Sequence, residues 1–237
     1  MARTQAFNDF IPVLRTAKEL GKIDSREYRD PPTVDERDAV RGLRGGAAVL
    51  MVAGFEAYLD DALREMIEFT KSYSPPVSFD QLPDGLRVQN VFGALEGVLH
   101  PPPHREPGTK VSRLPVIHMT SSIVGNKDLH PDAFGGSGGN PGKEALRAIL
   151  KTVGLTDIYR LLKPRFEKKW GQPVSDTFIG AKLDEIVRRR HRVAHRADAL
   201  SISRQELRES IKFLRVLSET LDIELGFHFR KVCRESR

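Results

Sequence analysis

The chain has 237 residues, of which 39% are hydrophobic, 30% charged and only 7% aromatic, and its formal net charge is +6. This composition excludes a chain disordered throughout and favours a mainly helical protein over a β-sandwich. The single cysteine, Cys233, excludes an intramolecular disulfide and a Cys-based zinc site, and it fits a reducing cytoplasm. We expect no signal peptide and no membrane span, because the most apolar run, residues 46–55, is interrupted by Glu56 and is far shorter than the ~20 residues a span needs. The positive charge makes a polyanionic partner plausible.

Two helices are predicted at the N-terminus. The first covers residues 6–20, where apolar side chains recur every three or four positions, and Pro12 should kink or delay it. Residues 30–33 should end this helix, with Thr33 and Glu36 forming the capping box of the next. That second helix, residues 34–72, contains no proline and is predicted to be the long central helix. Three glycines should let other helices approach it closely: Gly45, Gly46 and Gly54.

Residues 74–142 are predicted to form an irregular insertion, because most prolines of the chain and a glycine-rich run fall there. Two stretches within it, residues 86–99 and 115–124, have the pattern of short helices. Residues 135–142 are expected to form a mobile loop. The insertion would interrupt a single all-α domain that covers residues 1–237.

Helical periodicity resumes after the insertion. Residues 143–162 are predicted to be helical with an interruption near Gly154, and a further helix is predicted at residues 175–196. The last helix should begin at the capping box formed by residues 203–206 and end at Gly226.

The most informative segment is the basic run at residues 188–196. Arg190 falls on the apolar stripe of its predicted helix, where a guanidinium is costly unless it is paired or bound to an anion. Arg188 and Arg189 have acidic residues one turn earlier and are expected on a solvated face. Glu56 shares a stripe with apolar residues of the central helix, so it is either the partner of Arg190 or a residue at the stripe's edge that reaches water.

His191 and His195 are four residues apart and share a helical face, about 100° or more from Arg190 if the helix is straight. An imidazole can transfer protons near neutral pH, and an arginine can bind phosphate. Two other interpretations stay open. His195 could cap the helix C-terminus, or the two histidines with Asp198 could bind a metal, although no fourth ligand is evident. We favour the catalytic interpretation, because neither alternative explains Arg190.

The sequence Arg190-His191-x-x-x-His195 resembles the Arg-x4-6-His signature of HEPN ribonucleases. The resemblance extends to the block at residues 46–58, to Gly139-Asn140 at the entry to a helix, and to the end of that helix at residues 153–155. Together these features look like the RiboL-PSP branch of the superfamily. His191 departs from the pattern, because asparagine is the commoner residue at that position.

The resemblance implies a helical bundle that dimerises so that two Arg-His motifs face one cleft. It implies an endoribonuclease that uses neither metal nor cofactor, with Arg190 and His195 as catalytic residues and a 2′,3′-cyclic phosphate as product. His191 and Glu56 would support the site. Phosphates of the RNA would be held by Arg188, Arg189, Arg192 and Arg196. The family also suggests a toxin or phage-defence effector restrained by an antitoxin or sensor protein. The alternative is a non-catalytic helical module that binds RNA, a nucleotide or a protein.

Overall fold

The computed structural model describes residues 3–99, 117–118, 121–122, 125, 128–134, 141–196 and 199–236. Within these ranges all regular structure is helical, which confirms the predicted all-α class. The α-helices are α1 (Gln5–Glu27), α2 (Arg37–Lys71), α3 (Asp84–Leu99), α5 (Lys143–Thr152), α6 (Ile158–Trp170), α7 (Phe178–Arg196) and α8 (Arg204–Glu235). Two short 3-10 helices, η1 (Phe79–Gln81) and η3 (Pro131–Ala133), accompany them.

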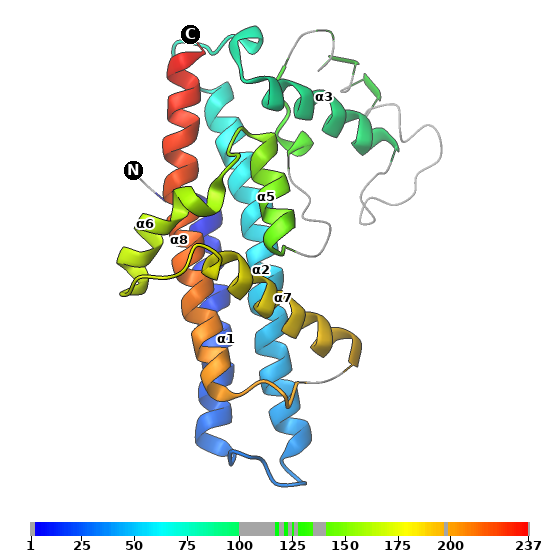
Figure 1. The fold of residues 1–237 in the computed structure, drawn as a ribbon. Helices are drawn as coiled ribbons and strands as arrows, with labels where there is room; N and C mark the ends of the chain where they lie inside the picture. The colour runs from blue at the N-terminus through cyan, green and yellow to red at the C-terminus, as the bar shows by residue number, and fades with distance from the viewer. Residues whose placement is uncertain are drawn as a thin grey trace.

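Three long helices, α1, α2 and α8, pack along one another and form the body of the molecule (Figure 1). The predicted central helix is confirmed as α2, although it begins at Arg37, three residues later than expected. The Glu36 carboxylate does accept a hydrogen bond from the Thr33 N–H at 2.8 Å, so one half of the expected capping box is present ahead of the helix.

Helix α1 is longer than its apolar pattern predicted. It begins at Gln5, where the hydroxyl of Thr4 accepts a hydrogen bond from the N–H of Phe7 at 3.0 Å, so Pro12 does not delay it. It continues to Glu27 rather than ending near residue 20. The extra turns carry Asp24, a fully buried acid that is paired with arginines from other helices. Tertiary contacts therefore extend the helix past its apolar stripe.

Of the three glycines of α2 that were predicted to let other helices approach closely, Gly45 and Gly54 lie at such close contacts. A Cβ atom at Gly54 would lie 2.7 Å from Cγ1 of Val13 on α1, and one at Gly45 would lie 3.1 Å from Cγ1 of Val193 on α7. Real side chains rarely approach so closely, so glycine at these two positions allows α1 and α7 to pack tightly on α2. Gly46 shows only ordinary contact distances.

The helices share one hydrophobic core, to which all seven α-helices named above contribute residues. Its aromatic centre at the α1–α2 contact consists of Phe10, Phe55 and Tyr58, with neighbouring ring centroids about 6 Å apart. The Tyr58 hydroxyl donates to the backbone oxygen of Ser218 at 2.9 Å, which ties α8 to the same cluster. Burial raises the pKa of Tyr58 well above its usual value.

The C-terminal half follows the sequence-based prediction except at helix ends: α6 continues to Trp170 instead of ending at residue 162, α7 begins at Phe178 instead of residue 175, and α8 ends later than predicted. Gly154, with φ of 92°, adopts the left-handed conformation after α5 and produces the predicted interruption. The capping box of Ser203 and Glu206 is present at the start of α8. The predicted end at Gly226 is wrong, because α8 continues to Glu235. Its extra turns bury Phe229 and other apolar residues, which outweighs the low helix propensity of one glycine.

The predicted helix at residues 86–99 is confirmed as α3, which packs against η3. Buried Asn90 joins the two, because its amide donates to the oxygen of Asp128 and its side-chain oxygen accepts from the N–H of His130, each at 2.8 Å. Most of the predicted helix at 115–124 and of the predicted loop at 135–142 lies outside the described residues.

Candidate functional site

Helix α7 carries the basic run. It crosses α2 and begins beside α6 and α8, and its final turns extend beyond α2 (Figure 1). The helix is held by a buried apolar face that includes Ile179, Leu183 and Ile186, each at most 1% exposed. The C-terminal turns are anchored by Val193 against Gly45 of α2. This attachment fixes which residues of the run face the solvent.

Four side chains form one exposed row on α7, which we call the α7 stripe: Arg188, His191, Arg192 and His195. They are spaced at i, i+3, i+4 and i+7, so they lie above one another on the same helical face. The rings of His191 and His195 are in contact, with centroids 4.2 Å apart and an interplanar angle of 46°. Arg188 donates from Nε to the backbone oxygen of Asp184 at 3.2 Å, which leaves its two terminal nitrogens available.

Arg190 lies on a different face of α7 from this stripe. It is half-buried and lies four residues after buried Ile186, on the apolar stripe where the sequence placed it. Its buried Nε has no hydrogen-bond partner, and no ion pair joins Arg190 to any acid within the described part of the chain. A buried N–H group without an acceptor is energetically unfavourable, so Arg190 is a candidate for contact with an anion.

The structure separates Arg190 from His195 within one chain. Helix α7 remains regular through Arg196, and five residues at about 100° each rotate the two side chains roughly 140° apart. Two arrangements could bring both side chains to one phosphate: an end of the helix between them, or a second copy of the chain. The regular helix excludes the first and leaves the second.

Arg189 corrects the sequence-based prediction. It was expected on a solvated face and as a phosphate ligand, but its side chain is only 9% exposed and forms ion pairs with both Glu185 and Glu206. Glu185 was the predicted partner, whereas Glu206 is contributed by α8 and could not be inferred from helical spacing. Because two carboxylates already neutralise Arg189, this residue is a poor phosphate ligand. The side chain of Arg196 lies outside the described residues.

Of the two alternatives given for Glu56, the ion pair with Arg190 is not found among the described residues. Glu56 is half-buried on α2, consistent with the alternative that it lies at the edge of its stripe. A supporting role of Glu56 in the site remains a prediction.

A metal site at the two histidines would need further ligands. Among the described residues, no group of three or more His, Cys, Asp or Glu side chains gathers as a metal site would require. Asp198, the carboxylate considered for such a site, lies outside that part of the chain. Within the described residues, no helix has the length and apolar character needed to cross a membrane.

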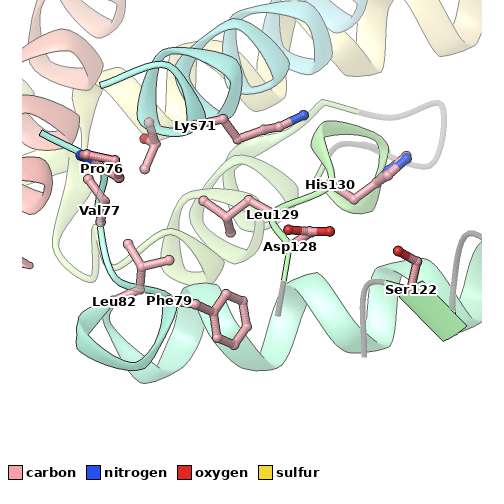
Figure 2. Close-up of a pocket in the computed structure, with 10 residues that line it drawn as sticks. Lys71, Pro76, Val77, Phe79, Leu82, Ser122, Asp128, Leu129 and His130 are labelled. Atoms are coloured by element: carbon pink, nitrogen blue, oxygen red, sulfur yellow. The ribbon is translucent and has the colours of Figure 1, made fainter. Parts of the chain in front are cut away.

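A separate cavity of about 570 Å³ lies at the other end of α2 (Figure 2). Lys71, Asp128 and His130 contribute polar groups, and its remaining wall is mainly apolar, including Val77 and Leu129. The cavity includes Thr70, whereas α7 reaches α2 at Gly45, and 25 residues of helix span about 38 Å. This cavity is therefore distinct from the α7 stripe.

Residues 137–226 match the RiboL-PSP-HEPN family. This match agrees with the resemblance suggested by the Arg190 to His195 motif, and the matched segment contains α5, α6, the whole of α7 and most of α8. The α1–α2 hairpin and the predicted insertion lie almost entirely outside it. No curated protein and no solved structure matched the chain.

Proposed function

We propose that the chain is a HEPN-type endoribonuclease that cleaves RNA without a metal ion. One observation carries this proposal: the segment that matches the family exposes His195 on a stripe with His191 and two arginines, while Arg190 of the same motif is half-buried with an Nε that has no hydrogen-bond partner. An exposed imidazole can exchange protons with a substrate, and arginines can bind its phosphates.

The reaction uses a nucleophile supplied by the RNA. The 2′-oxygen attacks the adjacent phosphorus, the P–O5′ bond breaks, and the products are a 2′,3′-cyclic phosphate and a 5′-hydroxyl. His195 either accepts the proton of the 2′-hydroxyl or donates one to the departing 5′-oxygen. Arg190 stabilises the negative charge that accumulates on the phosphate oxygens in the transition state. Arg188 and Arg192 hold neighbouring phosphates.

The active unit in this proposal is a homodimer. Arg190 and His195 face directions roughly 140° apart on one helix, so a single copy does not present both to one phosphate. In a two-fold symmetric dimer, Arg190 of one copy faces His195 of the other, and each dimer contains two equivalent composite sites.

Mixing two inactive variants tests this arrangement. Arg190→Ala and His195→Ala should each abolish cleavage of a single-stranded RNA in EDTA. When equal amounts are unfolded together and refolded, half of the dimers are mixed and each mixed dimer has one intact composite site. The mixture should therefore recover about a quarter of the parental activity. No recovery, with mixed dimers verified by differently tagged subunits, would refute the composite site.

The control substrates test the chemistry. An RNA with a single 2′-deoxynucleotide at the main cleavage position should survive there, and mass spectrometry should find a cyclic phosphate on the parental product. An intact parental RNA, or cleavage retained by both variants, would refute the ribonuclease proposal.

The divergence of Arg190 and His195 specifically favours one alternative, a non-catalytic module that binds RNA through the α7 stripe. It predicts RNA binding that is weakened by Arg192→Ala without any turnover by the parent. The toxin or phage-defence role, and a partner that restrains it, are expectations that rest on the family resemblance alone.

A further inference from the structure

A groove with a volume of about 280 Å³ lies between α1 and the beginning of α8. These two helices run side by side in the body of the molecule (Figure 1). The groove's apolar floor is formed by Gly21, Leu207 and Ile211. In the sequence, the groove is marked by basic residues at four-residue spacing on each of the two helices.

Every charged residue that lines the groove is a cation. On α1 they are Lys18, Lys22 and Arg26, and on α8 they are Arg204 and Arg208. Each set repeats every four residues, so each forms a row along its helix. The apolar floor therefore lies between two roughly parallel rows of positive charge.

Most of this positive charge is accessible. Lys22 pairs with Glu19 at 2.7 Å, but both side chains are more than half exposed, and such surface pairs contribute little. Neither Lys18 nor Arg208 forms an ion pair within the described residues, and both are exposed. Arg204 differs, because it is largely buried and bound to Asp24, so it is part of the framework rather than of the free rim.

The lining favours a protein segment over other anions. None of the lining residues is aromatic, so the groove lacks the stacking surface on which proteins hold unpaired nucleobases. Its volume lies just below the ~300–1,000 Å³ of small-molecule sites, but it accommodates one or two anchoring side chains of a docked peptide. An amphipathic helix with an apolar stripe between two rows of acids matches the floor and both cationic rows.

We propose that the α1–α8 groove docks an acidic amphipathic helix of a partner protein. The apolar anchors of that helix enter between Leu207 and Ile211, and its flanking carboxylates face Lys18, Lys22 and Arg208. None of these residues belongs to the α7 stripe, so docking and RNA binding use separate side chains. The proposal does not depend on ribonuclease activity.

A designed peptide tests the groove in the full-length protein. The probe is a fluorescein-labelled, helix-forming peptide of about 18 residues, with leucines on one stripe and glutamates on both sides of it. Its binding is followed by fluorescence anisotropy. We expect saturable binding that is lost when the leucines are replaced by serine. The double variant Lys18→Glu/Arg208→Glu should bind the leucine peptide at least about tenfold more weakly.

The matched control is Lys151→Glu/Lys168→Glu, which changes two other exposed lysines and alters the net charge equally. It should bind like the parent, and circular dichroism should show that both double variants are folded. The proposal is overturned if the peptide does not bind, if the serine peptide binds equally well, or if both double variants weaken binding alike. Displacement of the peptide by single-stranded RNA or by dodecanoate would also overturn it, by assigning the groove to nucleic acid or to a fatty acid.

Discussion

Replacing Asp24 by asparagine should cause a large loss of stability. The Asp24 side chain is fully buried, and its carboxylate accepts hydrogen bonds from Nε of Arg44 at 2.9 Å and Nε of Arg204 at 3.2 Å. Arg44 also donates to the backbone oxygen of Ile202 at 2.9 Å. This cluster joins α1, α2 and α8 to the connection that follows α7.

The expected magnitude follows from burial. Asp24→Asn preserves the shape of the side chain but leaves the guanidinium of Arg44, only 3% exposed, without its main counter-charge. Breaking a buried ion pair on one side costs about 3–5 kcal/mol. The matched control, Asp38→Asn, removes a carboxylate that is 91% exposed and pairs with Arg41, and such surface pairs contribute at most ~1 kcal/mol.

Urea unfolding at neutral pH, followed by circular dichroism, measures both losses. A loss for Asp24→Asn below about 1 kcal/mol, or equal to that of Asp38→Asn, would refute the reasoning about burial.

The pH dependence of the stability is a second readout. Burial alone would raise the pKa of Asp24, but hydrogen bonds from Arg204 and Arg44 lower it below 3.8. The stabilisation is therefore present above pH 3.8 and is lost as the pH falls through the folded pKa, and Asp24→Asn should lack this acid-dependent loss.

Three further predictions concern single residues. Gly54→Ala would place a Cβ 2.7 Å from Val13 and should destabilise the protein by about 1–3 kcal/mol, whereas Gly42→Ala meets nothing within 4 Å and should be neutral or stabilising in thermal unfolding. Burial lowers the pKa of His228 from 6.5 despite its hydrogen bond to a backbone oxygen, so parental stability should decrease as the pH falls through 6.5, and a persistent decrease in His228→Gln would contradict this. Arg192→Ala should reduce the slope of log affinity for RNA against log salt by roughly one, and filter binding that shows an unchanged slope would argue against the α7 stripe.

The sequence by itself determined the elements whose signals are local. The proline-free, partly apolar run predicted α2, and the serine and glutamate three residues apart predicted the start of α8. The place of Arg190 on an apolar stripe was also visible from spacing alone, and the structure leaves its Nε buried without a partner. These features depend on residues within one or two helical turns, so periodicity and capping rules reach them.

Tertiary structure alone decided the features that depend on distant partners. The burial of Arg189 requires Glu206 from α8, and the extension of α1 past residue 20 requires Arg44 and Arg204 to pair with Asp24. The continuation of α8 past Gly226 likewise depends on core contacts. For the candidate site, the decisive finding is that α7 continues without a break from Arg190 past His195 to Arg196. This places the side chains of Arg190 and His195 on different faces of the helix. A local pattern specifies the period of a helix but not the residue at which the helix ends, so the sequence alone left the end of α7 open.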